Sequence, residues 1–196
     1  MKKVILIGGS PMVGKSTVAA LVASNLMFPC VSTDDIGEAL QTVSDINPMG
    51  SRDYLDYYAQ SDTQRLIDDM IEYHQKLEPA IARLIDIHSD WGNPLIMEGW
   101  ALYPEPVGRI NNEHVFSVWL IAEDGLLRKR MAMKKSFWQD AREPEKVIEN
   151  YLYRSEWHNR KLLEQCKTEK QRYIVIGEDS TAEGIVKVIL EMIKPD

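Results

Sequence analysis

A glycine-rich loop near the N-terminus combines a lysine with two hydroxyl residues in an order suited to binding phosphate. Residues 9–16, GSPMVGKS, match the pattern G-x-x-x-x-G-K-[ST] at every fixed position. The glycines allow several backbone amides to point at one anion, Lys15 supplies a mobile positive charge, and the Ser16 hydroxyl suits Mg²⁺. We predict a nucleoside triphosphate site made of Gly9, Ser10, Pro11, Met12, Val13, Gly14, Lys15, Ser16 and Thr17.

Two carboxylates follow the next short apolar segment, in the stretch STDDIG. A carboxylate at the end of a strand, beside a phosphate loop, can accept a proton from a hydroxyl or hold a metal-bound water. We predict that Asp34 is catalytic and lies near the metal. Asp35 is expected to cap the following helix or to support the substrate site.

The same residues, Asp34 to Gly37, also fit the D-x-x-G pattern of GTPase switches. This segment comes before the third predicted strand rather than after it, and the chain has no Asn-Lys-x-Asp motif for guanine. A GTPase is therefore disfavoured.

Glu98 ends the third apolar segment, in LIMEGW. Proteins with a loop of this kind commonly place an acidic residue there, near Mg²⁺. We predict that Glu98 supports the metal with Ser16 and Asp34 and that it adjoins the substrate. Trp100 and Tyr103 lie just beyond, where they can stack on or shape an acceptor.

A basic segment stands out at residues 128–142, RKRMAMKKSFWQDAR, in a chain of net charge −7. Arg130 and Lys134 are four residues apart and so share a helix face. Such a segment can fold over a triphosphate, exclude water and neutralise charge at the transferring group. We predict a lid at about 128–143 with Arg130 and Lys134 as catalytic cations; a solvated basic face is the alternative.

The elements that must position these residues alternate between strand and helix, which predicts a parallel, doubly wound α/β sheet. The predicted strands are residues 2–8, 29–33, 93–99, 114–122 and 172–179. Six helices are predicted. The first covers residues 14–26, the second begins at a cap formed by Asp34 or Asp35, and the third covers residues 63–88. The fourth lies in the basic segment, the fifth runs from Pro144 to about Gln165, and the sixth covers residues 181–193. Pro79 is expected to kink the third of these helices or restart it near Glu78.

The composition limits the class of protein further. A length of 196 residues suits one domain, 1–196, and the excess of acidic residues makes a nucleic-acid partner unlikely. No apolar run approaches the length of a membrane span, and the N-terminal apolar run is too short for a signal peptide. We expect a cytoplasmic protein without a membrane partner and with both cysteines, Cys30 and Cys166, reduced in the core. The sequence gives no indication of oligomeric state.

Together these stretches resemble the small P-loop kinases, the group of nucleoside monophosphate, shikimate and gluconate kinases. The resemblance implies a P-loop NTPase fold with three α/β/α layers and a five-stranded parallel sheet in the order 2-3-1-4-5. It also implies a substrate arm at about 44–92 and the lid after the fourth strand. ATP and Mg²⁺ are the implied cofactors, with Arg130 against the base and Lys134 near the phosphates.

Two stretches are similar to particular kinases. The opening GGSPMVGKST with VSTDDIGEAL resembles polynucleotide-type kinases, in which the first aspartate of the pair acts as base. By this resemblance the base is Asp34. Gly37 stands where those enzymes usually carry arginine. IMEGWALYP is similar to a stretch of 2-phosphoglycerate kinases, which favours a small anionic acceptor.

The sequence therefore predicts transfer of the terminal phosphate of ATP to a small-molecule acceptor, such as a phosphorylated or acidic metabolite. A switching or non-catalytic NTPase and a kinase for nucleosides or polynucleotide ends remain as alternatives. On the acceptor side, Arg52, Arg83 and Arg109 are candidates for binding an anion.

Overall fold

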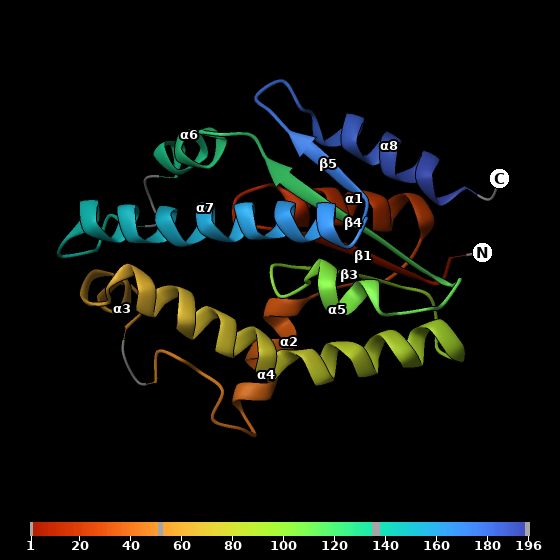
Figure 1. The fold of residues 1–196 in the computed structure, drawn as a ribbon, viewed down its shortest axis with the longest axis horizontal. Coiled ribbons are helices and arrows are strands. Elements are labelled where there is room, and N and C mark those ends of the chain that lie inside the picture. The colour runs from red at the N-terminus through yellow and green to blue at the C-terminus, as the bar shows by residue number, and fades with distance from the viewer. Residues whose placement is uncertain (1, 51–52, 135–137, 195–196) are drawn as a thin grey trace.

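A five-stranded parallel sheet forms the centre of the computed structural model, which describes residues 2–50, 53–134 and 138–194 (Figure 1). The strands are β1 (Val4–Gly9), β2 (Cys30–Ser32), β3 (Leu95–Gly99), β4 (Val115–Ala122) and β5 (Tyr173–Ile176). Their order is β2-β3-β1-β4-β5, and each neighbouring pair is parallel. The predicted fold class and strand order are confirmed.

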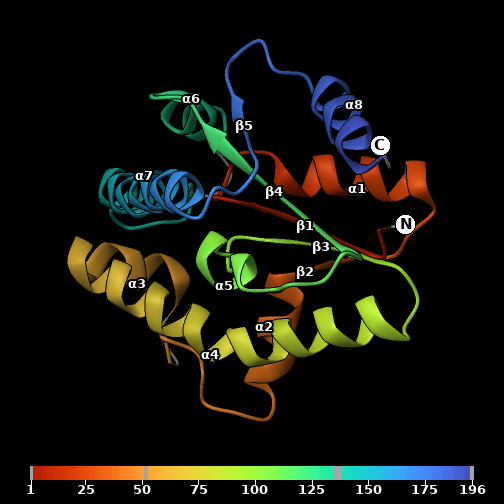
Figure 2. The same cartoon turned by 45° about the vertical axis from the view of Figure 1, so that its right-hand side comes forward.

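Helices cover both faces of the sheet (Figure 2). One layer contains α1 (Lys15–Leu26) and α8 (Ala182–Ile193), and the other contains α4 (Thr63–Asp90) and α5 (Pro104–Gly108). The remaining helices are α2 (Thr33–Gln41), α3 (Tyr54–Gln60), α6 (Leu126–Met133) and α7 (Pro144–Thr168). In β1, Ile5 and Ile7 pack toward α1 while Val4 and Leu6 pack toward α4, because successive side chains of a strand point to opposite faces.

The start of α2 differs from the sequence prediction. Ser32, rather than Asp34 or Asp35, is the N-cap, and its hydroxyl accepts a hydrogen bond from the Asp34 amide at 3.2 Å. Serine is a good N-cap, and the two carboxylates behind it lie in the first turn, where the helix dipole favours negative charge. Asp34 thus projects from a helix start rather than from a strand end.

Pro79 does not restart the long helix that contains it. α4 runs without interruption from Thr63 to Asp90, and its axis changes direction near the middle (Figure 1). Leu77, Ile81 and Ile85 are buried on both sides of the proline, so packing against the sheet holds the two halves together.

The prediction for the cysteines is correct for Cys166, which is buried, and wrong for Cys30, which is exposed. Cys30 begins β2, and β2 is the edge strand of the sheet, so one side of the strand has no neighbour. Burial therefore ends with the sheet at this position.

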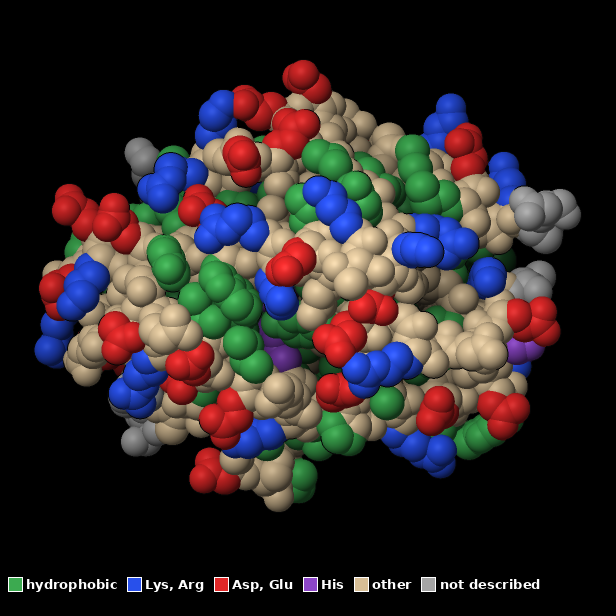
Figure 3. Space-filling view, viewed as in Figure 1, with side chains coloured by type: hydrophobic (Ala, Val, Ile, Leu, Met, Phe, Trp, Pro, Cys, Tyr) green, Lys and Arg blue, Asp and Glu red, His purple; other side chains and the backbone are tan. Residues whose placement is uncertain are grey.

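The surface mixes charges of both signs. Lysine and arginine side chains alternate with carboxylates over the face shown in Figure 3. Among the described residues, no helix combines the length and apolar character that crossing a membrane requires.

Candidate active site

The phosphate loop links β1 to α1 through a tight backbone path that requires glycine. A Cβ on Gly9 would lie 2.8 Å from Val13 Cγ1 and 2.9 Å from the Leu120 carbonyl oxygen. Gly14 is the N-cap of α1 and has a φ of 96°, a backbone conformation that residues other than glycine rarely adopt. The loop therefore leads directly into the first turn of α1, where unpaired amides gather.

Lys15 lies beneath this loop with 8% of its surface exposed. Burial lowers the pKa of its ammonium group, and the nearby carboxylates of Glu98 and Asp34 act against this shift. The sheet brings these groups together, because Glu98 is in register with Ile7 of β1 and with Ser32 of β2. Glu98 is itself buried, and its Oε2 has no hydrogen-bond partner among the described residues.

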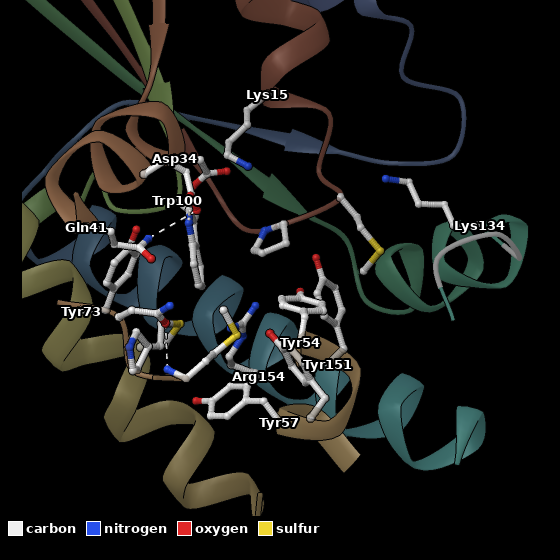
Figure 4. Close-up of a pocket in the computed structure, with 18 residues that line it drawn as sticks. Lys15, Asp34, Gln41, Tyr54, Tyr57, Tyr73, Trp100, Lys134, Tyr151 and Arg154 are labelled. Atoms are coloured by element: carbon white, nitrogen blue, oxygen red, sulfur yellow. Dashed lines mark hydrogen bonds between the residues drawn. The ribbon is translucent and has the colours of Figure 1, made fainter. Parts of the chain in front are cut away.

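A cavity of about 390 Å³ adjoins the loop at the carboxyl edge of the sheet. Lys15 and Asp34 lie at one end of it, and Arg154 lies among tyrosine side chains at the other (Figure 4). The cavity is of a size that holds a small ligand. Its lining consists of Pro11, Met12, Lys15, Asp34, Glu38, Gln41, Asn47, Pro48, Met49, Tyr54, Tyr57, Tyr58, Met70, Tyr73, Trp100, Lys134, Tyr151 and Arg154.

Arg154, in the middle of α7, is the cation at the far end of the cavity, and only 7% of its surface is exposed. Its guanidinium Cζ lies 4.4 Å from the ring centre of Trp100, 5.0 Å from that of Tyr58 and 5.4 Å from that of Tyr151. Among the described residues no carboxylate forms an ion pair with it, and its Nε is buried without a hydrogen-bond partner. A buried cation without a counter-ion is costly, so this group is suited to an anionic ligand.

Two asparagines of α7 fix the position of Arg154. Asn150 donates to the carbonyl oxygens of Tyr58 and Ser61 at 2.8 and 3.1 Å, which ties α7 to α3. Five residues beyond Arg154, Asn159 exchanges hydrogen bonds of 2.9 Å with the backbone of Ala122 and accepts one from Ser10 Oγ at 3.4 Å. α7 is thereby connected both to the cavity wall and to the phosphate loop.

Several solved structures with this architecture are kinases. A sugar kinase from Janibacter sp. HTCC2649 has a TM-score of 0.58 and 18% identity, covering 97% of this chain and 94% of that one. Shikimate kinase from Acinetobacter baumannii, solved with shikimate, has a TM-score of 0.57 and 14% identity, and the match covers 98% of this chain and 93% of that one. A gluconokinase from Sinorhizobium meliloti 1021 has a TM-score of 0.53 and 14% identity, and the match covers 97% of this chain and 92% of that one. The chain has the fold of the small P-loop kinases. No protein-family model matches the sequence, and no curated protein shows significant sequence similarity to it.

Within this P-loop kinase fold, the basic residues predicted for the lid lie on two sides of the loop. Arg130 donates a hydrogen bond from Nη1 to the Met12 carbonyl oxygen at 2.9 Å, and Met12 itself adopts a φ of 66°. Lys134 follows α6 and lines the cavity. Arg130 thus holds the loop from outside, whereas Lys134 faces the space beside Lys15.

The other predicted residues are distributed unevenly. Trp100 lines the cavity, whereas Tyr103 lies behind it, with its hydroxyl 3.1 Å from His74 Nδ1, and borders a second, smaller cavity of about 190 Å³. Asp35 is exposed and does not line the larger cavity. Ser16 and Thr17 are exposed at the start of α1.

Of the arginines named from the sequence, Arg83 and Arg109 do not line the cavity. Arg83 and Arg109 are exposed, and Arg109 pairs with Glu105 on its own helical segment. Arg52 lies outside the described residues. Sequence reasoning missed Arg154, although its place on the apolar face of α7, in helical spacing with Val147, Tyr151, His158 and Leu162, distinguishes it from a surface arginine.

Gly37 makes room for the cavity wall. A Cβ at this position would lie 1.9 Å from the Tyr73 hydroxyl oxygen, so the arginine usual here in polynucleotide-type kinases has no space. Tyr73 lines the cavity at the place that such a side chain would reach.

Two buried histidines back the wall formed by Trp100. The ring of His74 meets the Trp100 ring edge-on at 4.3 Å, and the ring of His158 lies 5.9 Å from that of His74. Burial lowers the pKa of His158 to about 3 and that of His74 well below its ordinary value, and the Arg154 charge acts in the same direction. Both rings are therefore neutral in the folded protein at neutral pH.

Acidification is expected to destabilise the protein through these rings. The unfolded chain binds a proton at each histidine below about pH 6.5, and the folded chain does not, so their contribution is complete above that pH and is lost as the pH falls toward 3. The free energy of unfolding should fall by up to about 2 kcal/mol per histidine between pH 6.5 and 5. Urea unfolding at pH 7, 6 and 5 measures this, and His158→Gln should remove roughly half of the slope. An unchanged slope in that variant would contradict the assignment.

Proposed function

We propose that this protein is a kinase that transfers the terminal phosphate of ATP to a hydroxyl group of a small anionic acceptor. The observation that carries the proposal is Arg154: a buried cation with no carboxylate partner among the described residues faces Asp34 and Lys15 across a cavity beside the phosphate loop. A phosphate or carboxylate group of the acceptor supplies the missing counter-charge. The phosphorylated or acidic acceptor expected from the sequence, such as 2-phosphoglycerate, has this chemistry.

The donor side is assigned to the loop and its neighbours. Backbone amides of residues 9–16, the start of α1 and the Lys15 ammonium bind the triphosphate, and Lys134 adds a cation beside the transferring group. Arg130 keeps the loop in place through its bond to Met12. Contact of Arg130 with the adenine base stays a prediction.

The residues present fit a Mg²⁺ ion shared with the nucleotide. Glu98 has a buried carboxylate oxygen without a hydrogen-bond partner among the described residues, and Ser16 follows Lys15 at the helix start. In the described part of the chain no three His, Cys, Asp or Glu side chains gather as a metal site. Mg²⁺ commonly takes most of its ligands from phosphates and water. When bound, Mg²⁺ neutralises charge on the phosphate oxygens.

Asp34 is assigned the proton. The acceptor O–H bond breaks, the proton passes to the Asp34 carboxylate, the acceptor oxygen bonds to the γ-phosphorus, and the bond from that phosphorus to the ADP oxygen breaks. The remaining catalysis comes from positioning and charge stabilisation. The tyrosines around Arg154 exclude water from this end of the cavity.

A screen of ATP consumption tests the proposal. The panel pairs hydroxylated acids and phosphate esters, including 2-phosphoglycerate, sugar acids and nucleotides, with uncharged or cationic acceptors such as nucleosides and aminoglycosides. Acceptor-dependent ADP release is expected for anionic acceptors. ATP hydrolysis that no acceptor changes would favour a switching NTPase, and transfer to oligonucleotide ends would favour a polynucleotide kinase; either result overturns the proposal.

A further inference from the structure

Trp100 contacts both charged groups of the proposed acceptor site. Its indole Nε1 donates a hydrogen bond to Asp34 Oδ1 at 2.7 Å, and its ring lies 4.4 Å from the Arg154 guanidinium carbon. The residue follows β3 directly after Gly99 and lines the cavity between the two groups (Figure 4). One side chain thus connects the carboxylate assigned to the proton with the cation assigned to the anion.

The indole ring is held in place from behind. The ring of His74 meets it at an interplanar angle of 88°, and the ring of His158 lies 6.1 Å away at 72°. Both histidines are buried, and Arg154 packs on the ring face. Because these contacts restrict rotation of the ring, the direction of its N–H group toward Asp34 is fixed.

A carboxylate has two oxygens and turns about the bond that carries it, so without a partner its lone pairs are not directed. A hydrogen bond from an indole N–H occupies one oxygen and leaves the other for the acceptor. An orientation error of about 1 Å in a reacting group costs as much as a hundredfold in rate. The bond to Trp100 is therefore of direct value to the proposed proton transfer.

We infer that Trp100 is a positioning residue for phosphoryl transfer: its N–H group fixes Asp34 so that Oδ2 takes the acceptor proton, while its ring supports Arg154. This inference rests on the proposed kinase function. It separates two roles within one side chain, since the N–H group acts on the rate and the ring acts on acceptor binding.

Two substitutions separate these roles. Trp100→Phe keeps an aromatic ring beside Arg154 and removes the N–H donor, so kcat should fall about 10- to 100-fold while KM for acceptor and for ATP stays within about threefold. Trp100→Leu also removes the aromatic face, so it should lower kcat and raise KM for the acceptor. Trp91→Phe is the matched control, because Trp91 is 74% exposed at the end of α4. An unchanged kcat in Trp100→Phe overturns the inference, whether or not KM for the acceptor rises.

A second measurement does not depend on an acceptor. The chain has five tryptophans, and each gives one indole N–H signal in a ¹H–¹⁵N spectrum. Trp100→Phe identifies the Trp100 signal, and Asp34→Ala should shift that signal more than the other four and speed its hydrogen exchange. No shift of the Trp100 signal overturns the inference even if the screen finds an acceptor. A shift without any acceptor-dependent turnover instead refutes the kinase function.

Discussion

Asp34→Asn should retain ATP binding and lose phosphoryl transfer by about 10²- to 10⁴-fold, the range for removal of a general base. The amide keeps an oxygen that can accept the Trp100 N–H hydrogen bond, so the geometry of the site is preserved while the proton acceptor is removed. Initial rates with saturating acceptor measure kcat, and titration with ATP in the absence of acceptor measures donor affinity. The donor affinity should be close to that of the unchanged protein, because the loop and Lys15 are intact.

Asp35→Asn is the control for this substitution. Asp35 has the same chemistry in the same helical turn and is exposed like Asp34, but it lies outside the cavity lining. Its replacement should leave turnover nearly unchanged. Equal turnover in Asp34→Asn would remove Asp34 from the catalytic role.

Arg154→Met should weaken acceptor binding and stabilise the free protein. Loss of a buried charge that meets a ligand anion costs about 3 kcal/mol, which corresponds to about a hundredfold rise in the acceptor KM. In the absence of acceptor the same change removes a buried cation that has no carboxylate partner in the described part of the chain, and a methionine fills similar space. We expect a gain of about 1 kcal/mol in the free energy of unfolding, net of the lost contacts with aromatic rings.

The opposite signs of the two effects make this prediction specific. Replacing a residue whose role is structural lowers the free energy of unfolding of the protein. Replacing a buried charged residue whose role is ligand binding raises it. Arg160→Met, one and a half turns along α7 on the exposed side, should change neither quantity. Thermal unfolding with and without acceptor measures the stability, and the KM for the acceptor measures its binding. A destabilised Arg154→Met protein with an unchanged KM would assign Arg154 to the fold.

The fold and the position of the phosphate loop were predictable because their signals are local. The loop motif occupies eight consecutive residues, and the alternation of apolar strands with amphipathic helices determines a parallel sheet whose carboxyl edge gathers Lys15, Asp34 and Glu98. Boundaries shifted by one to three residues. The cap of α2 moved to Ser32, because serine and aspartate are both good N-caps and the sequence does not rank them.

The acceptor side was not predictable to the same degree. Arg154 comes from a helix that follows the segment predicted to be a lid, and it reaches the cavity only because Asn150 and Asn159 fix the rotation of α7 against α3 and β4. The tyrosines of α3 come from Tyr54–Gln60, which is not among the helices predicted from the sequence. These positions depend on tertiary contacts between residues 37 to 149 apart, which spacing along the chain does not encode.

The hydrogen bonds of Asn159 have a consequence for redesigning the substrate range. Since this side chain joins the helix of Arg154 to Ser10 and Ala122, a substitution that tilts α7 to admit a larger acceptor will also displace the loop to which we assign the donor. Variation directed at Tyr54 and Tyr57 changes the volume of the cavity from α3 and leaves that connection intact. Libraries built on α3 should therefore yield altered acceptor preference with unaltered ATP affinity, whereas libraries built on α7 should change both together.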